Sequence, residues 1–397
     1  MELKLSNRIQ KLKTSPIRKL IPYGEEATKA GKKVHHLNIG QPDIKTPMVF
    51  YEAIRNYFEP VLKYANSAGT PELISSIIDY YARRGMNYSS EDILITSGGV
   101  EGISFALTAL CDVGDEIIIP EPYYANYNSF FNTLGINVSA VRTYAETGFH
   151  LPSIEEIEKK ITPKTKAIML SNPSNPTGTV YSLKEMEMLA EVAKKYDLYI
   201  ISDEVYREFV YGENRAISFG TFKEIEDRVI IVDSISKRYS ACGARIGCII
   251  SKNRVLMQSI YRLCQARLCV PTLEMIGAAA LYTIDDSYLE TVRLEYEKRR
   301  GILYEELCKI DGVVVGQPEG AFYSVVKLPI ENAEDFAMWL LKEYELNGET
   351  ILITPAEGFY KTEGAGRNEI RISYAIEEEK IRTAMNILKQ ALSAYKS

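Results

Sequence analysis

The chain has 397 residues, of which 46% are hydrophobic and 25% are charged, and its formal net charge is −6. This composition is typical of a soluble globular protein with two or three domains, or with one large and one smaller α/β domain. The acidic balance and the lack of a basic block argue against nucleic acid as a partner. No run approaches about 18 apolar residues, so we expect no membrane span.

The cysteines and histidines exclude further kinds of site. The six cysteines form no CxxC pair and several lie in apolar runs, which predicts reduced thiols in a reducing compartment. The polar N-terminus lacks the apolar core of a signal peptide, so we expect a cytoplasmic protein. The three histidines have neither metal-ligand spacing nor a neighbouring nucleophile motif, and no metal site is expected.

In chain order, four apolar runs each end in small or polar residues. The runs 93–95, 167–170, 198–201 and 229–232 lead into segments that carry Gly98, Asn175, Asp203 and Lys237. Helical patterns separate most of the runs, and this alternation predicts an α/β fold with a mostly parallel, doubly wound sheet. Since ligands bind beyond the carboxyl ends of such strands, we expect these four residues to share one cleft.

A second α/β unit is predicted towards the C-terminus. A long helical pattern covers 288–307, and the Asp285-Asp286-Ser287 segment could cap it. Runs 313–315, 322–326 and 370–373 are predicted strands, and 333–345 and 377–394 are predicted helices. We expect a large domain at 46–285 and a small domain formed by 1–45 and 286–397, with the long helix bridging the two.

Lys237 is the most informative single residue. It follows a buried strand and lies in a turn of small residues, where partial desolvation would favour the neutral amine that forms a Schiff base. Alone, it would be an ordinary surface lysine. Gly98 and Gly99 open a helix whose free N–H groups could bind phosphate, with Arg245 and Ser234 as further ligands. No dinucleotide or P-loop motif is present.

Asp203 and its neighbours extend this set. Asp203 ends an apolar strand, so it is either a helix cap or a placed charge, and Tyr206 lies about one helical turn further on. Asn175 lies between two prolines in a rigid loop, 172–178. A lysine, an aspartate, a tyrosine, an asparagine and a phosphate cradle together describe a pyridoxal 5'-phosphate site.

At this point the chain resembles the class I/II aminotransferases of fold type I, the aspartate aminotransferase group. The resemblance rests on NPSNPTG at 172–178, SDEVY at 202–206, Ser236-Lys237 and GARIG at 243–247, and it extends from LNIGQPD at 37–43 over nearly the whole chain. It implies a ping-pong transfer of an amino group between an amino acid and a 2-oxo acid such as 2-oxoglutarate, through pyridoxamine phosphate.

The resemblance also implies residue roles. Lys237 would bind pyridoxal phosphate and move the substrate α-proton, Asp203 would pair with the pyridinium nitrogen, and Tyr206 and Asn175 would bind the ring oxygen. The phosphate would be held by Gly98, Gly99, Val100, Ser234 and Arg245.

Four further residues have implied roles. Tyr124 would stack on the cofactor ring, Arg371 would bind the substrate α-carboxylate by a bidentate fork, and Gly40 would add a backbone N–H. Asn175 is expected to bind the substrate as well. Tyr64 resembles the tyrosine that reaches the phosphate of a partner subunit, which implies a homodimer with shared active sites.

Two residues depart from the family pattern, and the second of them argues against recognition of an acidic side chain. Ala244 stands where a tryptophan is common, and Val100 stands where some aspartate-using relatives carry a lysine. For Arg267 there are two interpretations: it replaces that lysine as a ligand for a side-chain carboxylate or, more simply, it lies on a helix surface. Aspartate and aromatic amino acids are the leading donors. A β-lyase, an aminocyclopropane-carboxylate synthase or a cofactor-binding regulator remain as alternatives.

Overall fold

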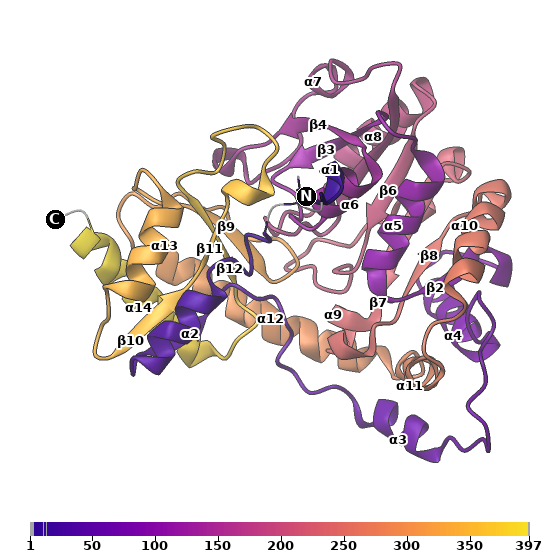
Figure 1. The fold of residues 1–397 in the computed structure, drawn as a ribbon, viewed down its shortest axis with the longest axis horizontal. Coiled ribbons are helices and arrows are strands. Elements are labelled where there is room, and N and C mark those ends of the chain that lie inside the picture. The colour runs from indigo at the N-terminus through magenta and orange to yellow at the C-terminus, as the bar shows by residue number, and fades with distance from the viewer. Residues whose placement is uncertain (1–3, 11, 13, 396–397) are drawn as a thin grey trace.

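The structure, a computed structural model, describes residues 4–10, 12 and 14–395. Its strands gather into a seven-stranded sheet and, on the other side of the molecule, two small sheets of two and three strands (Figure 1). None of the helices in the described residues combines the length and the hydrophobicity that crossing a bilayer requires.

The large sheet has the strand order β2-β8-β7-β6-β5-β3-β4. Strand β8 is antiparallel to both of its neighbours, and all the other pairs are parallel. The predicted α/β fold with a mostly parallel sheet is therefore confirmed. The strands are β2 Ile93–Thr96, β3 Glu116–Glu121, β4 Asn137–Arg142, β5 Thr165–Ser171, β6 Tyr199–Asp203, β7 Val229–Ser234 and β8 Gly247–Ile250.

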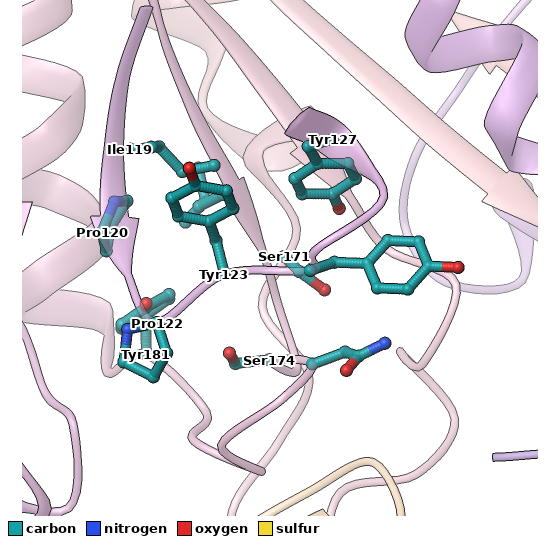
Figure 2. A pocket seen from close by; sticks show the side chains of 11 residues that line it. Ile119, Pro120, Pro122, Tyr123, Tyr127, Ser171, Ser174 and Tyr181 are labelled. Atoms are coloured by element: carbon teal, nitrogen blue, oxygen red, sulfur yellow. The ribbon is translucent and has the colours of Figure 1, made fainter. Parts of the chain in front are cut away.

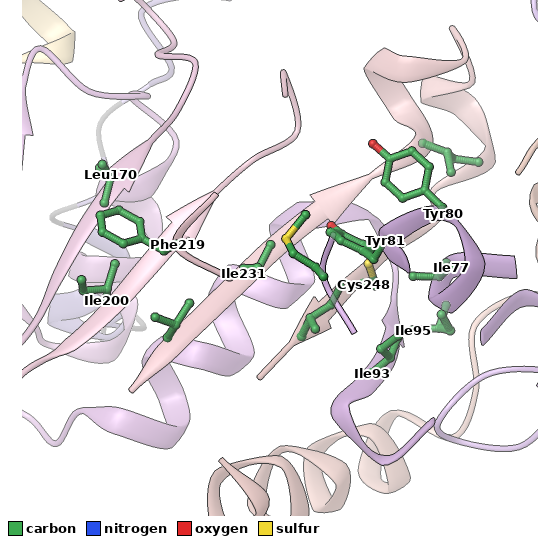
Figure 3. Packing of buried hydrophobic residues seen from close by; sticks show 14 of the residues in the cluster. Ile77, Tyr80, Tyr81, Ile93, Ile95, Leu170, Ile200, Phe219, Ile231 and Cys248 are labelled. Carbon is green, nitrogen blue, oxygen red and sulfur yellow. The ribbon is translucent and has the colours of Figure 1, made fainter. Parts of the chain in front are cut away.

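Both faces of this sheet are buried. On β2, Ile93 and Ile95 belong to one hydrophobic core and Leu94 belongs to the other, and the remaining strands alternate in the same way. Figure 3 shows the first core, where Tyr80 and Tyr81 from helix α4 pack beside the strands. Burial on both faces explains why the strands are continuous apolar runs in the sequence.

Helices cover the two faces. They are α3 Met48–Asn56, α4 Pro71–Ala82, α5 Gly98–Leu110, α6 Tyr127–Leu134, α7 Ile154–Glu158, α8 Leu183–Lys195, α9 Ile235–Arg238, α10 Arg254–Arg267 and α11 Thr272–Leu281. Local sequence fixes where some of them begin. The Thr70 hydroxyl caps α4, whose first residue is Pro71, and Ser182 and Glu185 form a capping box at α8.

The small sheets combine the two ends of the chain. Strand β1 Lys33–His36 pairs in parallel with β10 Glu349–Leu352. Strands β11 Thr354–Pro355, β12 Glu369–Ser373 and β9 Tyr323–Lys327 form an antiparallel sheet. The helices of this part are α2 Ile21–Lys29, α13 Ala333–Lys342 and α14 Glu378–Tyr395, and a short helix α1, Asn7–Gln10, precedes them.

One long helix, α12 Asp286–Leu307, connects the two parts. Asp285 accepts a hydrogen bond from the Ser287 backbone N–H at 2.9 Å, which confirms the predicted cap. Leu289 packs in a core of the large sheet, and Val292 and Tyr296 pack in the core of the small sheets. The helix therefore belongs to both cores.

One predicted strand is wrong. Residues 313–315 form no strand, and Val314 makes only a single bridge with Lys327. Val314 is 36% exposed, so this apolar run is only partly buried and does not extend beyond the single bridge.

Candidate active site

The carboxyl ends of three neighbouring strands place the central residues of the site. Ser171 at the end of β5 is in register with Asp203 at the end of β6, and Asp203 is in register with Val232 of β7. The loop 172–178 with Asn175 follows β5, and α9 with Lys237 follows β7. Segments that are distant in the sequence thus meet at one edge of the sheet, as predicted.

Lys237 is half-buried in the last turn of α9. Its Nζ donates to the backbone oxygen of Gly40 at 2.8 Å and lies 3.7 Å from the Cys242 Sγ. The amino group therefore lies between the large sheet and the segment that follows β1.

Asp203 is a buried carboxylate with polar but uncharged hydrogen-bond partners. The Tyr127 hydroxyl donates to its Oδ2 at 2.5 Å, and the Val205 N–H donates to its Oδ1 at 3.3 Å. Burial raises the pKa of Asp203 to about 6, although both hydrogen bonds and the nearby Lys237 oppose this rise. Such a carboxylate is suited to a protonated ring nitrogen, which would supply the positive charge that the carboxylate lacks.

Arg371, in β12, is 1% exposed and anchors the opposite side of the site. Its Nη1 donates to Asn175 Oδ1 at 3.2 Å, its Nη2 donates to the Asn38 backbone oxygen, and its buried Nε has no hydrogen-bond partner. Burial lowers the pKa of Arg371, and no carboxylate of the described residues forms an ion pair with it. A buried, unpaired guanidinium is a ready binding site for a carboxylate.

Tyrosine side chains line the space between these groups. The Tyr206 and Tyr323 hydroxyls lie 3.0 Å apart, and the Arg371 guanidinium lies 4.6 Å from the centre of the Tyr323 ring. Burial, followed by the field of Tyr323, raises the pKa of Tyr124 to about 12, while Arg371 lowers it. A Cβ on Gly40 would fall 1.7 Å from the Tyr323 hydroxyl oxygen, so only glycine fits there.

The start of α5 forms a cradle with Arg245. Gly98 has a φ of +73°, and a Cβ there would fall 2.4 Å from the Arg245 Nη2. Arg245 is exposed and donates to the Cys242 backbone oxygen at 3.0 Å. Gly99 and Val100 follow in the first turn of α5, and Ser234, at the start of α9, donates its hydroxyl to the Ile246 backbone oxygen at 2.8 Å. This arrangement places an exposed cation beside the N-terminus of a helix, which is a combination that favours a phosphate group.

Tyr124 and Asn175 are among the residues that line a small cavity. Its volume is about 10 Å³, room for one water molecule, and Figure 2 shows the Tyr123 and Tyr127 rings beside it with Ser174 opposite. The cavity is therefore too small to hold a second ligand.

Two predicted residues lie outside this cluster. Tyr64 is 81% exposed, in a segment without regular structure between α3 and α4. Arg267 forms an ion pair with Glu101 at 2.9 Å and donates to the Ser67 backbone oxygen at 3.0 Å. The Arg267 guanidinium is thus occupied by the protein itself, and the structure favours neither a substrate contact nor a plain helix-surface role.

Sequence reasoning missed Tyr127, Tyr323 and Asn38. Tyr127 is the first residue of α6 and follows Tyr124, which lies in a loop, so no periodicity in the sequence links the two residues. Tyr323 and Asn38 reach the site through contacts between distant segments, for which the sequence offers no local signal.

The chemistry of these groups fits pyridoxal phosphate. The buried acid without a cation partner suits its ring nitrogen, and the amino group suits its aldehyde. The glycine cradle beside an arginine suits its phosphate, and the arginine without an ion-pair partner suits the carboxylate of a substrate.

Comparisons with known proteins lead to the same family. The model of the family "Aminotransferase class I and II" matches residues 32–388. A probable aspartate/prephenate aminotransferase from Aquifex aeolicus is 32% identical over 393 residues, which is 98% of either chain. An aspartate aminotransferase from Pyrococcus horikoshii is 30% identical, over 99% of this chain and 98% of the relative.

A solved structure agrees with these sequence matches. An alanine aminotransferase from Pyrococcus furiosus superposes with a TM-score of 0.90 at 31% identity, over 98% of this chain and 100% of that one. The family predicted from the motifs is therefore confirmed. The chain belongs to the class I and II aminotransferases, and it is an amino-acid aminotransferase that uses pyridoxal 5'-phosphate.

Proposed function

We propose that this enzyme moves an amino group from aspartate or an aromatic amino acid to a 2-oxo acid such as 2-oxoglutarate, in two half reactions at one site. The observation that carries this proposal is the buried guanidinium of Arg371, which has no ion-pair partner in the described residues. Amino acids and 2-oxo acids share the α-carboxylate that this group would bind by a fork of two hydrogen bonds.

The remaining roles are proposed residue by residue. Bound pyridoxal phosphate supplies an electron sink for the electrons released at the substrate α-carbon. Asp203 keeps a proton on the cofactor's ring nitrogen, and Tyr206 and Asn175 donate hydrogen bonds to its ring oxygen. Lys237 binds the cofactor, and its Nζ then carries the proton away from the substrate α-carbon.

Backbone and aromatic groups complete the proposed site. Gly98, Gly99, Val100, Ser234 and Arg245 hold the cofactor phosphate at the start of α5. Tyr124 stacks on the ring, and Gly40 adds a backbone N–H towards the substrate. The close packing of Gly40 against Tyr323 supports a role for its backbone.

The proposed donors follow from the relatives and from the aromatic lining. The relatives reported above are named for aspartate, aspartate/prephenate and alanine. Tyr124, Tyr206 and Tyr323 lie near Arg371, so the carboxylate end of a substrate would meet aromatic rings. Arg267 already binds Glu101, so an aspartate side chain would need another cation of the site.

The first experiment is a single half reaction. Purified enzyme with bound cofactor is mixed with one amino acid at a time, without any oxo acid, while the visible absorbance is recorded. We expect aspartate or an aromatic amino acid to remove the visible band and to yield one oxo acid per site. An amino acid that binds but releases ammonia, or that yields no oxo acid, would contradict the proposal.

We also propose that the enzyme is a cytoplasmic homodimer with shared sites. Met48, Tyr51, Phe58, Leu62 and Tyr64 are large apolar side chains exposed on α3 and the segment after it. Such a patch favours contact with a second copy, which would carry Tyr64 to the partner's phosphate. In the same proposal, residues 46–285 form the large domain and 1–45 with 286–397 form the small one.

A further inference from the structure

The 359–362 segment lies against the end of strand β3 of the large sheet. It precedes β12, the strand of the small sheets that carries Arg371. The backbone N–H of Tyr123, two residues beyond β3, donates to the Phe359 backbone oxygen at 2.9 Å. A segment of the small-sheet part is thus bonded to the chain that leads from β3 to Tyr124.

Glu121, the last residue of β3, makes the main side-chain contact with this segment. The side chain is fully buried, and its Oε2 accepts from the backbone N–H groups of Lys361 at 2.7 Å and Thr362 at 3.0 Å. Lys361 and Thr362 are themselves exposed. The buried carboxylate therefore ties a solvent-facing piece of backbone to the large sheet by two charge-assisted hydrogen bonds.

Arg142 balances the charge of Glu121. It is the last residue of β4, in register with Glu121, and its Nη1 lies 3.5 Å from Glu121 Oε1. The Arg142 guanidinium also lies 4.6 Å from the centre of the Tyr360 ring, within the range of a cation–π attraction. Both members of this ion pair, on neighbouring strands of the large sheet, thus contact the 359–362 segment.

The other side of the segment contacts the proposed substrate arginine. Phe359 is fully buried, and the Arg371 guanidinium lies 5.2 Å from the centre of its ring. A ring at this distance attracts the guanidinium and limits where it can lie. Because the Phe359 backbone is bonded to the β3 end, the large sheet reaches Arg371 through this ring.

We propose that Glu121 is a positioning residue for the transfer reaction. It holds the 359–362 segment against β3, so that Phe359 packs on Arg371 and the guanidinium faces the substrate carboxylate. This inference rests on the proposed role of Arg371. Among the described residues the Glu121 carboxylate contacts the segment and Arg142, so it acts through Phe359 and not on the reacting atoms.

The test is steady-state kinetics of the holoenzyme with aspartate or tyrosine as donor and 2-oxoglutarate as acceptor. Glu121→Ala should raise KM roughly tenfold for donor and acceptor alike, with kcat within about twofold of wild type, because carboxylate binding is weakened and proton transfer at Lys237 is not. Glu121→Gln should restore KM, because its amide oxygen can accept the same two N–H groups. Glu116→Ala, at the other end of β3, is the matched control.

Two further variants separate positioning from a general loss of structure. Phe359→Leu removes the ring from Arg371 directly and should also raise KM. Effects of independent sites multiply, but the Glu121→Ala/Phe359→Leu double variant should raise KM by clearly less than the product of the two single effects. Glu121→Asp covers a folding defect of the alanine variant, since it keeps the buried charge but is one methylene too short to reach both N–H groups. It should raise KM as well.

The inference is overturned if neither Glu121→Ala nor Glu121→Asp raises KM, or if kcat falls in place of a rise in KM. It is also overturned if Glu121→Gln behaves like the alanine variant, or if the effects of Glu121→Ala and Phe359→Leu multiply. Arg371→Leu distinguishes the two levels of the argument. An unchanged KM in that variant rejects the proposed role of Arg371, whereas a raised KM there with an unchanged KM in Glu121→Ala rejects only the positioning role.

Discussion

Arg371 carries a buried charge for which the described residues supply no counter-ion. Replacing it with leucine should raise KM roughly 100-fold for the amino acid and for the oxo acid alike, because both substrates carry an α-carboxylate. Steady-state kinetics with each substrate varied in turn would measure this. Arg371→Lys keeps the charge but loses the fork, so its KM should lie between those of the wild type and Arg371→Leu. An unchanged KM in Arg371→Leu would exclude this role for Arg371.

Lys237 gives a spectroscopic prediction. Lys237→Ala should lose the visible absorbance of the bound cofactor and all transaminase activity, because it removes the amine that is proposed to bind the aldehyde. Circular dichroism should show an intact fold, since the side chain is half-buried and donates only to Gly40 and Cys242. A retained visible band in this variant would rule out the assignment of Lys237.

Tyr127 should act through Asp203. Its hydrogen bond opposes the rise in the Asp203 pKa, so Tyr127→Phe should raise that pKa further and reduce the carboxylate fraction near neutral pH. We expect kcat/KM at pH 7 to fall about fivefold and the acid limb of its pH profile to move to higher pH. Tyr123→Phe is the matched control, because that hydroxyl bonds Asn128 instead, and an identical shift in both variants would count against this role.

At this scale the residues at strand ends could be predicted directly from the sequence, whereas Arg371, in the middle of β12, followed only from the family resemblance. Asp203 and Lys237 could be predicted because each follows a continuous apolar run. Tyr323 and Asn38 could not, because their place in the site depends on how the small sheets pack against the large one. The role of Tyr64 depends on a second chain and stays a prediction.

Among the elements, α8 is held at its N-terminus by ion pairs with a histidine. His150 lies 3.0 Å from Glu185 of the capping box and 3.4 Å from Glu319, which precedes β9. The hydrogen bonds with Glu185 and then Glu319 raise the pKa of His150 to about 10. The folded pKa lies above the unfolded value of about 6.5, so this stabilisation is fully present below about pH 6.5 and is lost as the pH rises through 10.

His150→Gln should therefore lower Tm at pH 6 and leave it nearly unchanged at pH 10.5. The loss at pH 6 should be about 1 kcal/mol or less, because about a third of the His150 side chain is exposed and solvent screens the pair. Thermal melts at both pH values would measure the difference, with His36→Gln, an exposed histidine, as the control. A destabilisation that is equal at both pH values would contradict a charge-dependent tie.

The elements themselves were largely predictable. Alternating apolar runs and helical patterns predicted a mostly parallel sheet because a strand buried on both faces must be apolar at every position. The prediction of a strand at 313–315 was wrong because an apolar run does not by itself supply a strand partner: this run is only partly buried and makes one bridge.

For the molecule as a whole, the exposed Tyr64 predicts subunit complementation. A Tyr64→Phe dimer and a Lys237→Ala dimer are each impaired, but after subunit exchange a mixed dimer should contain one site with an intact Lys237 and an intact Tyr64. We expect the activity of the mixture to exceed the sum of the activities of the two separate dimers. Mass spectrometry of tagged chains would confirm exchange, and additive activity after exchange would show that Tyr64 does not cross the interface.

Helix α12 connects the two hydrophobic cores, so a small bend in it would move one core relative to the other. Its 22 residues span roughly 33 Å, with Leu289 fixed in one core and Ile302 and Leu303 fixed in the other. A bend of about 5° near its N-terminal end would displace its C-terminal end by about 3 Å. Arg371 lies on the small sheets, whereas Lys237 lies beside the large sheet. A bend of this size would therefore change the distance between a substrate carboxylate and the reacting amine without disturbing the packing inside either core.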